Sequence, residues 1–208
     1  MPSCPAFGRG TGVAAVPHWE VEVNSGKASA AGSIRVREAT PADLPAVQRI
    51  YAHHVLHGLA SFEQEPPDLE EITRRYESVV KQSLPYLVAE SAGKVLGYAY
   101  AAPYRPRISY RFTLEDSVYV DDAERGRGVG RMLMSELVTR CEGLGYRQML
   151  AVIGDSANTG SIGLHKALGF EEAGMLRSVG FKFGRWVDTV IMQRALGPGD
   201  STLPPEQG

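Results

Sequence analysis

The segment 116–131 constrains the fold of this chain most, because its residues predict a strand, a glycine-rich turn and a helix in direct succession. Residues 117–120, Ser-Val-Tyr-Val, have the β-branched and aromatic character that is typical of a strand. The chain therefore passes from a strand through a short turn into an amphipathic helix. The apolar stripe of that helix, at helical spacing, comprises Leu133, Met134, Leu137, Val138 and Cys141.

The turn at 125–131 has the sequence Arg-Gly-Arg-Gly-Val-Gly-Arg. Its glycines leave backbone N–H groups uncovered at the start of a helix, where the helix dipole favours negative charge. The spacing fits neither the phosphate-binding loop, which needs Lys-Ser or Lys-Thr, nor the dinucleotide pattern G-x-G-x-x-G. The turn therefore predicts a pyrophosphate site of another kind, with an ordinary basic turn as the alternative.

Composition excludes several classes of partner. The 208 residues suffice for one sizeable core, and 22 Lys and Arg against 24 Asp and Glu give no reason to expect nucleic acid. No apolar run approaches the roughly 20 residues that span a bilayer, so we expect no membrane segment, and glycines and prolines interrupt the region where a signal peptide would lie. With only Cys4 and Cys141 present, we expect no structural disulfide and a reducing cytoplasm.

The residue types divide the chain into three parts. Residues 1–33 are rich in Gly, Ala, Ser and Pro, and we expect a disordered extension or a segment upstream of the native start. Residues 34–196 carry the regular patterns and form the expected domain. Residues 197–208 are again rich in Gly and Pro, and we expect a flexible tail.

Within the domain, strand and helix patterns follow one another in the order β-α-α-β-β-β-α-β-α-β-β, which indicates the α/β class. Thr40 caps the first helix and Gly58 ends it, and Asp68 opens the second. The second helix is expected to bury Ile72, Tyr76, Val79 and Val80. The expected strands lie at 34–38, 86–90, 94–100, 117–120, 148–153, 170–177 and 186–193, and the last helix lies at 158–168.

Arg125, Gly128 and Gly130 match the pattern Arg-x-x-Gly-x-Gly, which resembles the coenzyme A loop of the GNAT acetyltransferase superfamily. The order of elements is similar to that of the same superfamily, whose fold is a mixed central sheet flanked by helices. The segment 161–170 resembles the GNAT helix with a Tyr four residues before Gly-Phe. Here that position is His165, which can donate a proton in place of the Tyr, with water as the alternative donor. The resemblance implies acetyl-CoA as co-substrate and no metal.

The helix at 158–168 also suits an extended pantetheine arm. Asn158, Ser161 or Ile162, and His165 share one face over about 10.5 Å, with Asn158 near the amides of the arm and His165 near its sulfur. A histidine packed for structural reasons is the alternative. Backbone N–H groups at 118–120 are expected to stabilise the oxyanion, as in GNAT enzymes. The expected cofactor-binding residues are Val118, Tyr119, Val120, Arg125, Gly126, Arg127, Gly128, Val129, Gly130, Arg131, Asn158 and Ser161.

Glu115 is the expected general base. An acceptor amine is largely protonated at neutral pH and needs a base before it attacks a thioester. Glu115, Ser117 and Tyr119 alternate onto one face of the strand, whereas Asp116 faces the other way. Asp116 is the rival base, and a solvated strand face is the alternative without function.

Five further segments narrow the resemblance to the phosphinothricin/methionine sulfoximine N-acetyltransferases. They are 61–66, 86–90, 114–120, 151–154 and 174–188, the last reading Gly-Met-Leu-Arg-Ser-Val-Gly-Phe-Lys-Phe-Gly-Arg-Trp-Val-Asp. This resemblance implies that Glu115 and His165 are catalytic, that the acceptor is a small amino acid-like amine, and that the protein is a homodimer. The implied acceptor-binding residues are Tyr104, Arg107, Tyr110 and Arg111 of the loop before the strand at 117–120, and Phe62, His53 and Lys182 are further candidates. Surface charge or core packing is the alternative for each of them.

Two other functions stay open from the sequence. The acceptor could be a polyamine, an aminoglycoside or a protein N-terminus, although Arg105, Arg107 and Arg111 do not suit a polyamine. A coenzyme A-binding module without turnover is the rival from another class, and the presence of both Glu115 and His165 argues against it.

Overall fold

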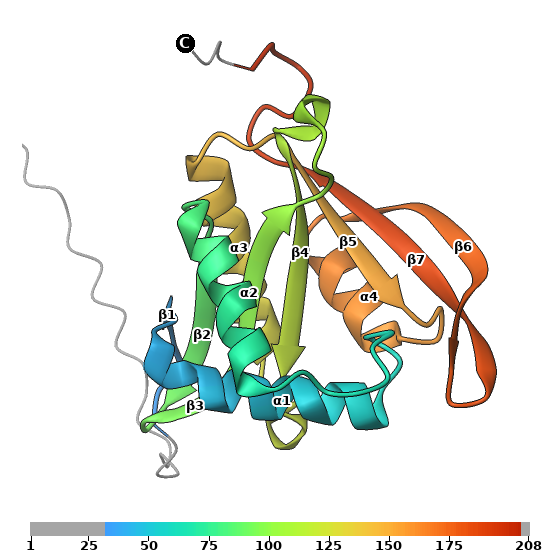
Figure 1. The fold of residues 1–208 in the computed structure, drawn as a ribbon. Helices are drawn as coiled ribbons and strands as arrows, with labels where there is room; N and C mark the ends of the chain where they lie inside the picture. The colour runs from blue at the N-terminus through green and yellow to red at the C-terminus, as the bar shows by residue number, and fades with distance from the viewer. Residues whose placement is uncertain (1–31, 205–208) are drawn as a thin grey trace, which may run out of the picture. The chain divides into compact units, whose positions relative to one another are not determined.

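The computed structural model describes residues 32–204, so Cys4 and nearly all of the expected extension at 1–33 lie outside the described part. Helices and strands follow the predicted order, and the predicted fold, a mixed sheet flanked by helices, is confirmed (Figure 1). The elements are β1 Arg35–Glu38, α1 Leu44–His57, α2 Leu69–Lys81, β2 Tyr86–Ser91, β3 Lys94–Pro103, β4 Thr113–Val120, α3 Val129–Gly143, β5 Gln148–Gly154, α4 Thr159–Ala167, β6 Glu171–Lys182 and β7 Arg185–Ala195.

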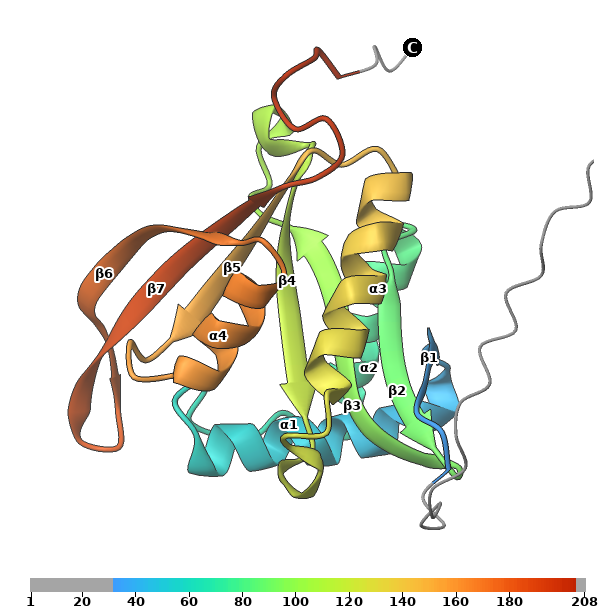
Figure 2. The same cartoon turned by 180° about the vertical axis from the view of Figure 1, so that it is seen from behind.

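The strands of the described chain form one sheet in the order β1-β2-β3-β4-β5-β7-β6. Only β4 and β5 pair in parallel, and the other neighbours are antiparallel. Helices α1 and α2 cover one face, and α3 and α4 lie on the opposite face (Figures 1 and 2). The core therefore lies on both sides of the central strands.

Strands β4 and β5 separate partway along their length. Their pairing runs from Thr113 with Gln148 to Asp116 with Ala151 and stops there. Residues 117–120 still pair with β3 on the other side. Beyond Asp116, one edge of β4 therefore has no strand partner, and polar side chains of the site gather beside it.

Local sequence signals explain how the helices begin. Thr40 and Asp43 form a capping box, and Asp68 accepts the backbone N–H of Glu71 at 2.8 Å. The predicted stripe of α3 is buried in full. The prediction for Val80 was wrong, because this side chain is 46% exposed and Val79 beside it fills the core position.

Beyond the sheet, the residues after Leu196 run as turns up to residue 204. Arg147 donates to the main-chain oxygens of Gly199 and Leu203 at 3.1 and 3.2 Å. Leu196 itself is fully buried. No helix in the described range combines the length and apolar character that crossing a bilayer requires.

Candidate active site

The glycine-rich turn opens a groove at the start of α3. Gly126 and Gly128 have φ angles of +75° and +79°, a left-handed backbone that other residues rarely adopt. A Cβ at either position would meet nothing within 4 Å, so the two glycines face open space. Gly130 lies closer to α4, because a Cβ there would approach Leu164 Cδ2 to 3.2 Å. The start of α3, at Gly128, Val129 and Gly130, lines this opening, and the first N–H groups of a helix have no partner within the helix.

We call this cavity of about 400 Å³ the glycine-loop groove. Of the predicted cofactor residues, Arg127 does not line it and instead forms an ion pair with Glu124. Arg125 lines the groove and also pairs with Asp122 at 3.0 Å. The predicted residues that do line the groove are Val118, Tyr119, Val120, Arg125, Gly126, Gly128, Val129, Gly130, Arg131, Asn158 and Ser161. Uncovered N–H groups, two arginines and an elongated wall of β4 and α4 fit acetyl-CoA.

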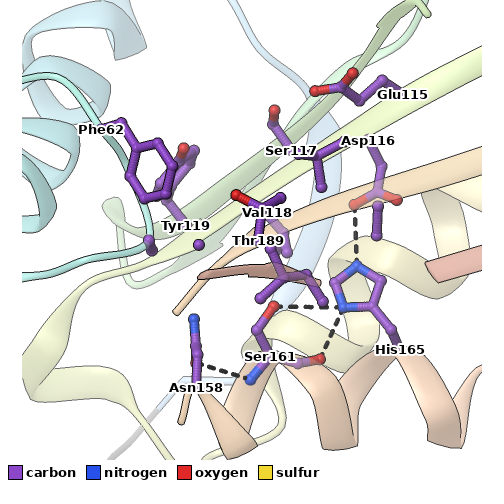
Figure 3. Close-up of a pocket in the computed structure, with 15 residues that line it drawn as sticks. Phe62, Glu115, Asp116, Ser117, Val118, Tyr119, Asn158, Ser161, His165 and Thr189 are labelled. Atoms are coloured by element: carbon purple, nitrogen blue, oxygen red, sulfur yellow. Dashed lines mark hydrogen bonds and ion pairs between the residues drawn. The ribbon is translucent and has the colours of Figure 1, made fainter. Parts of the chain in front are cut away.

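A second cavity, of about 240 Å³, lies in the gap between β4 and β5 and is called the Glu115 cavity (Figure 3). Glu115, Asp116, His165 and Phe62 line it, together with Thr189 of β7. It borders the glycine-loop groove, with which it shares part of its wall, and this border is called the junction of the two cavities. The residues that line both cavities are Ala60, Val118, Tyr119, Asn158 and Ser161.

Glu115 and Asp116 are neighbours in β4 but lie in different environments. Glu115 is half-buried, and this burial together with the nearby charge of Asp116 raises its pKa, while Arg105 partly offsets the rise. Asp116 is turned toward α4 and is buried, which raises its pKa as well. The opposite orientation of the two carboxyl groups agrees with the alternation expected from the sequence. A base with a raised pKa that still reaches solvent suits proton abstraction.

His165 is fixed on α4 by three contacts (Figure 3). Its Nε2 lies 3.0 Å from Asp116 Oδ1, and its Nδ1 lies 2.8 Å from the main-chain oxygen of Ser161 and 3.4 Å from the Ser161 hydroxyl. Burial alone would lower the pKa of His165, but the hydrogen bond and charge of Asp116 outweigh it and raise that pKa. The structure thus brings Asp116 to His165, a contact that sequence reasoning missed.

The predicted acceptor residues are spread over the fold, and their roles stay predictions. Phe62 lines the Glu115 cavity. Lys182 is 3% exposed and donates to the main-chain oxygen of Ser61 at 2.7 Å, so it holds the segment that carries Phe62. The other predicted acceptor-binding residues lie in the β3–β4 loop and line neither the glycine-loop groove nor the Glu115 cavity. They are Tyr104, Arg107, Tyr110 and Arg111.

The segment at 58–67 is held by a polar network that the sequence did not suggest. Tyr51 bonds to the hydroxyl of Ser61 at 2.8 Å and donates to Glu63 at 3.0 Å. Arg75 of α2 pairs with Glu63 at 2.7 Å. His54 was also missed: it contacts the main-chain oxygen of Val120 at 2.8 Å, whereas His53 lies outside both cavities. The sequence signal that could have indicated His54 was its position on α1, three residues after Tyr51.

The described chain offers no group of three His, Cys, Asp or Glu side chains that could hold a metal ion. Cys141 is buried and has no disulfide partner among residues 32–204, and burial raises the pKa of its thiol to about 12. A thiol so hard to ionise is a poor nucleophile. Glu115, Asp116 and His165 are the Glu, Asp and His side chains that line the Glu115 cavity.

Comparison with known proteins gives consistent matches. The family model of the acetyltransferase (GNAT) domain matches residues 36–191. A phosphinothricin N-acetyltransferase of Alcaligenes faecalis is 60% identical over 169 residues, 81% of this chain and 86% of that protein. An L-methionine sulfoximine/L-methionine sulfone acetyltransferase of Pseudomonas paraeruginosa is 42% identical over 167 residues, 80% of this chain and 96% of that protein.

Among solved structures, a GNAT superfamily phosphinothricin acetyltransferase from Sinorhizobium meliloti in complex with acetyl-CoA is similar, with a TM-score of 0.81 and 48% identity. The match covers 83% of this chain and 94% of that chain. The resemblance expected from the sequence is confirmed, and acetyl-CoA is the co-substrate that the groove fits. The chain belongs to the GNAT acetyltransferase family and is an acetyl-CoA-dependent N-acetyltransferase.

Proposed function

We propose that this enzyme transfers the acetyl group of acetyl-CoA to the amine of a small amino acid-like acceptor of the phosphinothricin or methionine sulfoximine/sulfone type. The names of its relatives support this class of acceptor. The observation that carries the proposal is the junction between the glycine-loop groove and the Glu115 cavity, with Glu115 on the acceptor side.

Direct attack in a ternary complex follows from this arrangement. Acetyl-CoA supplies the thioester that crosses the junction. Glu115 takes a proton from the acceptor amine, directly or through water, and its raised pKa suits that transfer near neutral pH. The unpaired edge of β4 at 118–120 offers N–H groups for the oxyanion. Asn158 caps α4 with its side-chain oxygen, and its amide N–H groups remain for the pantetheine arm.

The size of the Glu115 cavity favours a small acceptor. At about 240 Å³ it is smaller than the usual range for drug-sized ligands, which argues against an aminoglycoside. Arg105 brings positive charge toward Glu115 from the β3–β4 loop. Positive charge suits an acceptor with a carboxylate beside its amine and disfavours a polyamine. The roles of Arg107 and Arg111 in this recognition are also part of the proposal.

The test compares methionine sulfoximine with its decarboxylated amine, by thiol release from acetyl-CoA. Wild type should lose most of kcat/KM with the amine that lacks the carboxylate. Arg105→Ala and Arg111→Ala should each show a smaller difference between the two acceptors if that arginine binds the carboxylate. Equal use of both acceptors by wild type would refute carboxylate recognition, and turnover with peptides or polyamines alone would move the acceptor to those classes.

We also propose a homodimer in the reducing cytoplasm. Exposed apolar side chains lie on β6, β7 and the turn between them, which favours the burial of this surface against a second copy of the chain. They include Leu176, Val179, Phe181, Phe183 and Trp186. Sedimentation should give twice the chain mass for wild type, and Trp186→Arg should shift the protein to a monomer. A monomeric wild type at micromolar concentration would contradict the dimer.

A further inference from the structure

Both ring nitrogens of His165 already have partners inside the protein (Figure 3). The main-chain oxygen of Ser161 at 2.8 Å only accepts, so Nδ1 carries the proton of that bond. Nε2 lies against Asp116 at 3.0 Å. His165 is 2% exposed and lines the Glu115 cavity but not the glycine-loop groove. The ring therefore has no free N–H to offer directly to a sulfur that arrives through the groove.

Asp116 and His165 form a buried pair that retains a proton. Both side chains are 2% exposed, and Oδ2 of Asp116 has no hydrogen-bond partner among residues 32–204. An ionised carboxylate at such a place is costly unless a positive charge compensates it. Imidazolium at His165 provides that charge, and the raised pKa of His165 agrees with it. The pair is a proton store behind the junction.

Ser161 stands between this store and the junction. It lines both cavities, and its hydroxyl oxygen lies 3.4 Å from Nδ1 of His165, so the same N–H faces both oxygens of Ser161. Tyr119 also lines both cavities, but its ring faces α1, edge-on to Tyr51 at 5.0 Å, and burial raises its pKa well above the ordinary value. Ser161 is the shared wall residue with an O–H connected to the buried pair.

We infer that the Ser161 hydroxyl protonates the leaving thiolate and that the His165–Asp116 pair replaces that proton. The inference rests on the proposed function. As the C–S bond of the thioester breaks, its electron pair goes to sulfur, which takes the hydroxyl proton of Ser161. The serine oxygen takes the Nδ1 proton of His165, which breaks the hydrogen bond from Nδ1 to the main-chain oxygen of Ser161, and the ring becomes neutral with its Nε2–H on Asp116. The amine proton passes to Glu115 and then to solvent, and the pair regains a proton from solvent.

Acetyl-seleno-coenzyme A gives the discriminating comparison, because a selenolate is a much weaker base than a thiolate and leaves without protonation. In single turnovers, Ser161→Ala should be about 10²-fold slower than wild type with acetyl-CoA. With the seleno donor it should match wild type. Ser161→Thr keeps a hydroxyl and should retain most of the rate with both donors.

Ser156→Ala is the matched control. The hydroxyl of Ser156 donates to Asp188 at 2.9 Å just before α4, and Ser156 lines neither cavity. This variant should behave as wild type with both donors. His165→Phe should lose rate with acetyl-CoA and largely recover with the seleno donor, since it removes the source of the proton.

A second readout does not depend on turnover. The thiol pKa of bound coenzyme A, followed by the ultraviolet absorbance of the thiolate, should be higher in Ser161→Ala than in wild type, because a hydroxyl donor stabilises the thiolate.

The pH profile tests the buried pair. Asp116 is the titratable partner of His165, and the charge of Asp116 in turn acts on Cys141 of α3 and on Glu115 of β4. Asp116→Asn should lower the pKa of His165, so the alkaline limb of kcat should move to lower pH.

Two results would overturn the inference. One is an equal loss of rate with both donors in Ser161→Ala, which would give Ser161 a binding or structural role. The other is an unchanged rate with acetyl-CoA in that variant. Failure of wild type to acetylate any amine would instead contradict the proposed function, so the two failures are distinguishable.

Discussion

The ring of Phe62 lies directly against Gly180, where a Cβ would come within 2.5 Å of Phe62 Cε2. Gly154 at the end of β5 supports the same segment, since a Cβ there would come within 2.2 Å of the Leu59 oxygen. Two glycines thus let the segment at 58–67 settle close to the sheet. Phe62 thereby becomes a wall of the Glu115 cavity.

Gly180→Ala should therefore alter acceptor binding. The new methyl group forces Phe62 to move, which costs about 1–3 kcal/mol of unfolding free energy and changes the cavity wall. We expect the KM for the acceptor to change by about tenfold, equivalent to about 1.4 kcal/mol, with acetyl-CoA affinity preserved. Steady-state kinetics and calorimetry measure the two quantities. Gly174→Ala on the same strand is the control, because a Cβ there meets nothing within 4 Å; equal effects of both variants would contradict the role of Phe62.

Gly128→Val should weaken acetyl-CoA binding at least tenfold, about 1.4 kcal/mol. The side chain would enter the open space that the groove offers to the pyrophosphate. The left-handed backbone adds a strain of about 1–2 kcal/mol, which should leave the domain folded. Gly93→Val carries the same strain, at φ +76° in the β2–β3 turn, and Gly93 lines neither cavity. Calorimetry should find normal affinity for acetyl-CoA in Gly93→Val. An unchanged affinity for acetyl-CoA in a folded Gly128→Val would contradict the assignment of the glycine-loop groove as the acetyl-CoA site.

Glu115→Gln should lower kcat by about 10²–10⁴-fold, because the amide cannot accept the amine proton. The raised pKa of Glu115 places the acid limb of the wild-type profile above the ordinary range of a glutamate. Activity should fall as the pH falls through that pKa and the base becomes protonated. In Glu115→Gln this limb should disappear. Near wild-type turnover of the variant across pH 6–9 would assign the base elsewhere, with Asp116 as the next candidate.

Asp43 should make the fold sensitive to acid. Arg37 holds its carboxylate with bonds of 2.7 and 2.9 Å, and this lowers the pKa of Asp43 to about 2 from 3.8, against the effect of burial. A depressed pKa stabilises the fold at pH values above the pKa that the group has in the unfolded state. This stabilisation is lost as the pH falls toward 2. The group should contribute about 2 kcal/mol at neutral pH. Urea unfolding from pH 7 to pH 2.5 should show this loss in wild type and not in Asp43→Asn.

Glu70→Gln serves as the control for Asp43, because Glu70 is 80% exposed in its pair with Arg74. Such exposed pairs contribute little to stability. Parallel acid dependence in wild type and Asp43→Asn would show that the Arg37–Asp43 pair does not account for it.

Features encoded within one segment could be predicted from the sequence. The order of elements, the glycine turn and the buried stripe of α3 depend on local spacing, and they appear as expected. The contact of Asp116 with His165 joins residues 49 apart, and that of Lys182 with Ser61 joins residues 121 apart. Their partners follow from how the sheet and helices pack, which periodicity does not specify. The same reason explains why Lys182, predicted for the acceptor, lies under the segment that carries Phe62.

We expect the acetyl group to pass from acetyl-CoA to the amine of an amino acid-like acceptor, with Glu115 as the base. Mass spectrometry of a reaction with isotopically labelled acetyl-CoA and L-methionine sulfoximine measures this transfer directly, with thiol release counted in parallel. We expect the labelled N-acetyl product in equal amount to the free thiol, and a reaction slower by about 10²-fold or more in Glu115→Gln. Thiol release without an N-acetylated product, or acetylation only of peptides or polyamines, would contradict it.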